Sequence, residues 1–132
     1  MVLLTIGLVF AAVASLLHVF FFYLESVAFT APSTWKRFGV ASQADAEVLK
    51  PMAYNQGFYN LFLAIGTIVG IILVAVGHTA VGGALALFGT ASMALAGVVL
   101  ASTGSAMMRA AAIQFVPAAL AVLLTSIGLA TR

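Results

Sequence analysis

The sequence predicts an all-α integral membrane protein, a bundle of four transmembrane helices with one longer loop between the first two helices. Of the 132 residues, 64% are hydrophobic and only 6% are charged, which is too little polar surface for a water-soluble domain. A hydropathy window finds four separate apolar runs. Since each span needs roughly 20 residues, four spans with their connections use the whole chain, residues 1–132, as a single membrane domain.

The four expected spans are joined by connections of unequal length. The first run begins at Met1 without a positively charged start and is longer than the apolar core of a secretory signal, so we interpret it as a retained helix. Short connections at Gly77-His78-Thr79 and Thr103-Gly104-Ser105 separate the last three runs. The helices are expected at about residues 2–27, 52–76, 80–102 and 107–130.

The connection at about residues 28–51 has the composition of protein that faces water. Pro32 follows the end of the first span, and Ser42 with Asp45 three positions later has the spacing of a capping box that opens a short helix. Pro51 suits the first turn of the second span, where its missing N–H is not needed. We expect Trp35 to lie in the aromatic belt at the membrane boundary.

Positively charged residues near the helix ends predict the orientation, because they are retained on the cytoplasmic side. The first and third connections hold four such residues, and the opposite face has only Arg132 beside the chain termini. We therefore expect a multi-pass protein of the cell (inner) membrane with both termini outside and the first loop in the cytoplasm. The four residues are Lys36, Arg37, Lys50 and Arg109.

Several functional classes are disfavoured by what the sequence lacks. It contains no cysteine, which removes disulfides, thiolate metal sites and a cysteine nucleophile. Its formal charge of +2 comes from scattered residues, so we expect no nucleic-acid partner. A single deep imidazole at His18 and a shallow carboxylate at Glu25 make a poor ligand set for a metal or haem, so neither metal nor cofactor is expected.

The informative residues are polar ones inside the expected spans. An ionisable group in the bilayer costs on the order of 3 kcal/mol, so it usually faces the protein interior and serves a purpose. His18 and Glu25 are seven positions apart, which places both on one face of the first helix, about 10 Å apart along its axis.

Further polar side chains enter the membrane from the same end, in the second and fourth helices. Together with His18 and Glu25, they predict a polar pocket among helices one, two and four that opens toward the long loop. The expected ligand-binding residues on these two helices are Asn55, Gln56, Tyr59, Asn60 and Gln114.

These polar residues belong to a recognisable pattern. The sequence has His18 through Glu25, then Lys50-Pro51, then the block Asn-Gln-Gly-x-Tyr-Asn at residues 55–60, and finally Gln114 with Pro117. This pattern resembles a family of small four-helix bacterial membrane proteins classed as a domain of unknown function, along the length of the chain. The resemblance implies the four-helix topology and brings no settled activity.

Three functional hypotheses follow. The leading one is binding or translocation of a small polar or amphiphilic molecule, because neutral amide donors and acceptors orient a ligand well but transfer protons poorly. The second is a membrane-embedded enzyme of isomerase type, in which the candidate catalytic residues Glu25 and His18 share acid and base duties on a lipid-soluble substrate. The third is a structural or accessory subunit that uses the loop as its contact surface, with the lipid bilayer as its surroundings in every case.

Each group also has a purely structural interpretation. His18 could be a buried neutral imidazole, Glu25 an ion-pair partner of Lys50 or Arg109, and the amides interhelical hydrogen bonds. The Gly66 and Gly70 pair has the GxxxG spacing of helix packing, which we expect to be intramolecular, with a homo-oligomer seam as the alternative.

Overall fold

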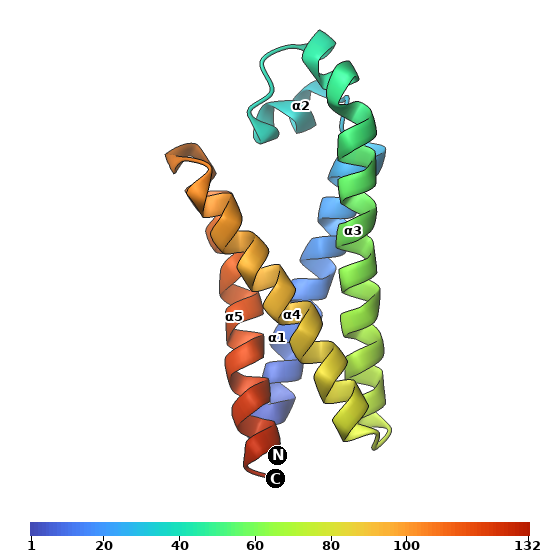
Figure 1. The fold of residues 1–132 in the computed structure, drawn as a ribbon, viewed down its shortest axis with the longest axis vertical. Coiled ribbons are helices and arrows are strands. Elements are labelled where there is room, and N and C mark those ends of the chain that lie inside the picture. Colours follow the sequence, from blue (N-terminus) through green and yellow to red (C-terminus); the bar gives the residue numbers. More distant parts are fainter. The chain divides into compact units, whose positions relative to one another are not determined.

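The computed structural model describes every residue from Met1 to Arg132 and is helical, without strands, which confirms the predicted fold class. Four helical stretches are long and apolar enough to cross a membrane. In Figure 1 the chain is labelled with α1 (Val2–Phe22), α2 (Pro32–Trp35), α3 (Gln43–Ala75), α4 (Thr79–Ser102) and α5 (Met108–Ala130). A π-helical turn at Tyr23–Val27 continues α1, and 3-10 turns occupy Lys36–Phe38 and Ser105–Met107.

The residues form two compact parts, which we describe separately. The bundle part consists of Met1–Leu17 and Leu63–Arg132, and therefore contains the beginning of α1, the end of α3, and the whole of α4 and α5. The loop part consists of His18–Phe62 and contains the end of α1, the first connection and the beginning of α3.

Small residues let the helices of the bundle part approach closely. A Cβ added at Gly82 of α4 would lie 2.6 Å from the backbone oxygen of Gly70 in α3, so these two glycines mark a direct backbone contact. This matches the intramolecular packing expected for Gly70. At Gly66 an added Cβ would meet nothing within 4 Å, so the other half of the GxxxG pair makes no close contact within the chain.

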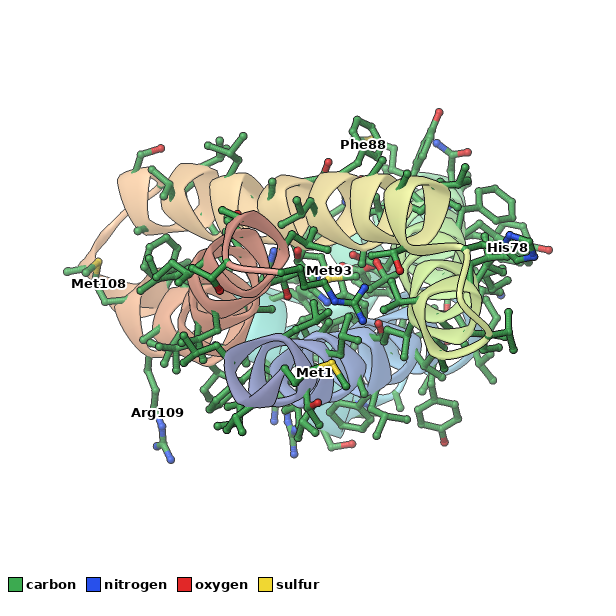
Figure 2. All side chains as sticks on the ribbon, turned by 90° about the horizontal axis from the view of Figure 1, so that it is seen from below. Met1, His78, Phe88, Met93, Met108 and Arg109 are labelled. Carbon is green, nitrogen blue, oxygen red and sulfur yellow. The ribbon has the colours of Figure 1, made fainter.

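The core of the bundle part is built around Met93, whose side chain is fully buried. Figure 2 shows Met93 among the helices, whereas Phe88 and Arg109 point away from them. Ala14, Ala94 and Ala118 pack in the same buried cluster as Met93. Large apolar side chains such as Phe88, Leu95 and Leu123 are exposed on the outside of these helices, as expected where the surroundings are lipid.

Both chain termini lie at one end of the bundle part (Figure 1). The Arg132 guanidinium donates a hydrogen bond to Thr79 Oγ1 at 2.7 Å and lies 3.9 Å from Met1 Sδ. The termini thus meet beside the turn between α3 and α4, which is the arrangement that an even number of antiparallel spans requires.

Helix α3 begins at Gln43, whereas the sequence analysis placed the start of the second span at about Met52. The predicted cap is present: the Asp45 N–H donates to Ser42 Oγ at 3.1 Å, and Ser42 Oγ donates to Asp45 Oδ2 at 2.6 Å. The expected short helix is continuous with the span because the φ angle of Pro51 suits a helix, so Pro51 lies inside α3 and not in its first turn. At 33 residues, α3 is about 50 Å long and exceeds a hydrocarbon core of about 30 Å, so its charged beginning extends into water.

The loop part has a small core of its own, with Trp35 at its centre. Trp35 is only 8% exposed, and its indole N–H donates to Gln43 Oε1 at 2.9 Å. Gln43 in turn donates from Nε2 to the backbone oxygen of Thr30 at 3.0 Å. Gln43 satisfies the indole N–H and allows the ring to be buried within the loop part, and the place of Trp35 at the membrane boundary stays a prediction. The core consists of Phe29, Trp35, Ala46 and Ala53, with Val40 and Leu49 packed against it.

Candidate functional site

Glu25 lies in the π-helical turn that ends the first span. In this turn the Ala28 N–H donates to the backbone oxygen of Tyr23 at 2.9 Å, a bond that spans five residues where an α-helix spans four. Such turns are uncommon and frequently occur at functional sites. The sequence analysis expected a regular helix to residue 27, and nothing in the composition of Tyr23–Val27 signals the wider turn.

The carboxylate of Glu25 is held by a side chain of α3. Asn60 Nδ2 donates a hydrogen bond to Glu25 Oε2 at 2.7 Å, and both residues are half-buried. The structure thus brings together two of the residues predicted to share a site. Such a bond can also serve only to hold two helices together. A functional role for Glu25 therefore needs a binding site next to its carboxylate.

A close contact between the π-helical turn and α3 sets this geometry. A Cβ added at Gly57 would clash with Ser26 Oγ and lie 3.0 Å from the Ser26 backbone nitrogen. Ser26 Oγ also donates to the backbone oxygen of Tyr54 at 2.8 Å. Glycine at position 57 is therefore required for the approach of the two segments, which places Glu25 within reach of Asn60.

An open cavity of about 300 Å³ lies beside Glu25, entirely within the loop part. Two of its lining residues are polar, Glu25 and Gln56, and the other six are apolar. The apolar residues come from the first connection and from the beginning of α3. They are Phe29, Phe38, Val40, Leu49, Met52 and Ala53.

Three other predicted site residues of the loop part do not line this cavity. His18 is buried in α1, with its ring edge-on to Phe21 at 5.2 Å between centroids. Asn55 and Tyr59 are exposed positions of α3. Neither Asn55 nor Tyr59 is among the residues that line the cavity.

Gln114, the predicted site residue of the fourth span, belongs to the bundle part. Its Nε2 donates to the backbone oxygen of Met93 at 3.2 Å, which joins α5 to α4. This is the kind of interhelical hydrogen bond that polar side chains form in membrane bundles.

The apolar lining residues were missed by the sequence analysis, although one signal for them exists. Leu49, Met52, Ala53 and Gln56 have the spacing i, i+3, i+4, i+7, which places them on one face of a helix. The pattern is visible only if the helix starts at Gln43, and the later predicted start concealed it.

No group of three or more His, Asp or Glu side chains lies close enough to hold a metal ion.

Four long apolar helices and so few charged residues define an all-α integral membrane protein. The model of the family DUF1304, described as a protein of unknown function, matches residues 12–126, and the chain belongs to this family. The resemblance predicted from the polar pattern is therefore confirmed. No curated protein and no solved structure matches the chain.

Proposed function

We propose that this protein binds a small amphiphilic molecule in the cavity beside Glu25. The observation that carries the proposal is the lining, which combines six apolar side chains with one carboxylate and one amide. Ligand sites in proteins are typically concave and mostly apolar, with a few polar groups that fix the orientation of the ligand. A volume of about 300 Å³ is at the lower end of the range for such sites.

The two kinds of lining have separate tasks. The apolar wall removes the hydrocarbon portion of a ligand from water, and this burial contributes roughly 25 cal/mol for each Å². Glu25 and Gln56 then take the polar end, for which Glu25 offers acceptors and Gln56 offers both a donor and an acceptor. We further propose that the loop part faces the cytoplasm, because Lys36, Arg37 and Lys50 lie there.

Binding is the function that we propose, without translocation or catalysis. All the lining residues come from the end of the first span, the first connection and the first half of α3, and a path across the membrane would need further polar groups along the spans. Acid and base chemistry by Glu25 and His18 would need both groups on one substrate, and His18 does not line the cavity.

The sole tryptophan provides the test. Trp35 packs in the same buried cluster as the lining residues Phe29 and Ala53, so its emission responds to what enters the cavity. We would titrate the protein, in a lipid-free non-ionic detergent, with octanol, octylamine and octanoate. At least one should give a saturable change in Trp35 emission, and native mass spectrometry should show the bound molecule.

Two variants make this test specific. Ala53→Leu fills the cavity and should weaken binding about tenfold or more, since an extra side chain occupies the volume that the ligand needs. Asn55→Leu, at an exposed position of the same helix that does not line the cavity, is the matched control and should bind like the wild type. If no probe binds saturably, or if both variants bind alike, the proposal fails and the structural or accessory role becomes the better account.

A further inference from the structure

We infer that the polar end of the ligand is an organic ammonium group, so that the cavity takes an amphiphilic amine. This inference rests on the proposed function and narrows it to one class of ligand. It is carried by the charge and the aromatic content of the lining.

Glu25 is the single charged residue that lines the cavity. The cations of the loop part, Lys36, Arg37 and Lys50, are not among the lining residues. Asn60 supplies one oxygen of Glu25 with a neutral donor, which satisfies that oxygen without balancing the charge. An ammonium group supplies both the missing donors and the missing charge, whereas a carboxylate or phosphate would meet like charge at Glu25.

Two phenylalanine rings complete the site for a cation. Phe29 and Phe38 both line the cavity, with ring centroids 5.7 Å apart and planes inclined by 52°. The face of an aromatic ring attracts a cation within about 6 Å, and pairs of rings recognise alkylated ammonium groups in this way. Gln56 adds an amide oxygen that can accept an N–H bond from the same group.

The same connection already holds one ammonium group against an aromatic ring. Lys36 Nζ lies 5.5 Å from the centroid of the Trp35 ring. Contact of this kind is therefore compatible with the local environment of the loop part.

An ammonium group can come from two sources, a free amphiphilic amine or the headgroup of a lipid. Both present the same chemistry to Glu25 and the two rings. Whether the ammonium group belongs to a free amine or to a lipid is therefore tested in a separate measurement from the charge of the ligand.

The central experiment compares three probes with the same eight-carbon chain, so that apolar burial is matched and only the head differs. Trp35 emission is measured in lipid-free non-ionic detergent near neutral pH, where an alkylamine carries its proton. We expect octylamine to bind about tenfold more tightly than octanol, and octanoate to bind most weakly, because only the amine forms a charge-assisted bond to Glu25.

Glu25→Gln keeps the shape of the side chain and removes its charge. In this variant the ratio of octylamine affinity to octanol affinity should fall from about ten to about one. Asp45→Asn is the matched control, because it removes a carboxylate of the same loop part that does not line the cavity, and it should retain the preference.

The outcomes separate this inference from the proposed function. Equal wild-type affinities for the three probes, or a preference that persists in Glu25→Gln, would overturn the ammonium assignment and leave amphiphile binding intact. Absence of saturable binding by every probe would overturn both. If Glu25→Gln loses its helical circular dichroism, Phe38→Leu takes its place. It should lower the ratio of octylamine affinity to octanol affinity about threefold, because the lost apolar contact weakens both probes and the lost cation–π contact weakens octylamine alone.

Competition with short-chain lipids identifies the source. If dihexanoylphosphatidylethanolamine displaces octylamine and dihexanoylphosphatidylglycerol does not, the ammonium of a lipid headgroup is the ligand. If neither lipid displaces octylamine, the ligand is a free amine. Displacement by the phosphatidylglycerol alone would contradict the assignment, because that headgroup has no ammonium.

Discussion

Asn60 donates a 2.7 Å hydrogen bond to Glu25 across 35 positions of sequence, which fixes the end of the first span against the second. The bond involves a half-buried carboxylate within a membrane-spanning segment, where few partners compete for it. Its removal should therefore be measurable in the stability of the whole chain as well as in binding.

Asn60→Leu should lower the thermal unfolding midpoint in detergent by several degrees, because a lost bond to a half-buried charged group costs about 1–3 kcal/mol. Asn55→Leu, an exposed amide one turn away, should leave the midpoint nearly unchanged. Thermal circular dichroism of the two variants checks this. Equal midpoints for both would show that the bond contributes nothing to stability.

Gly57→Ala should destabilise the protein by about 1–3 kcal/mol, since the new methyl group would overlap Ser26 and force the segments apart. Gly66→Ala offers a matched control on the same helix, because a Cβ there meets nothing within 4 Å. It should be neutral or slightly stabilising, as replacing glycine inside a helix usually is. Chemical unfolding of both variants gives the comparison, and a Gly57→Ala as stable as Gly66→Ala would contradict the close contact.

Gln43→Leu should loosen the first connection, because it removes the acceptor of the buried Trp35 indole N–H and the bond to Thr30. A buried donor without a partner costs about 1–3 kcal/mol. We expect faster proteolysis within residues 28–42 and a red shift of Trp35 emission. Gln43→Glu retains an acceptor for the indole and should keep the wild-type emission maximum.

Labelling of single cysteines tests the predicted orientation, and the absence of native cysteine makes the result unambiguous. A cysteine at the exposed position Thr131 should react with a membrane-impermeant maleimide on intact cells. One at the exposed loop position Ala41 should react only after the membrane is permeabilised. The reverse pattern would place the loop outside.

The sequence was sufficient for the features that depend on composition and on local spacing. Apolar runs located the spans, and Ser42 with Asp45 indicated a helix start that the structure contains. The start of α3 was misplaced because Pro51 was interpreted as a boundary. Proline inside a helix loses one hydrogen bond and crowds the carbonyl four residues earlier, yet α3 continues through it.

The candidate site could be predicted only in part, because it depends on contacts between distant residues. Glu25, Gln56 and Asn60 were singled out by their polarity alone, and the structure places Glu25 against Asn60 and beside the same cavity as Gln56. Phe29 and Phe38 could not be found in this way, because they are ordinary apolar residues until the fold of the connection places them beside a carboxylate.

The π-helical turn at Tyr23–Val27 makes the length of this segment as important as its composition. Because the turn contains one residue more than a plain α-helical turn, a single deletion inside it would convert it to regular helix while the helix before it keeps its phase. If the deletion spares Glu25 and Ser26, every side chain of the site stays in the protein, and yet the wider turn that holds Glu25 near Asn60 is lost. In-frame deletions of one codon therefore test the length of this turn, which no substitution can change.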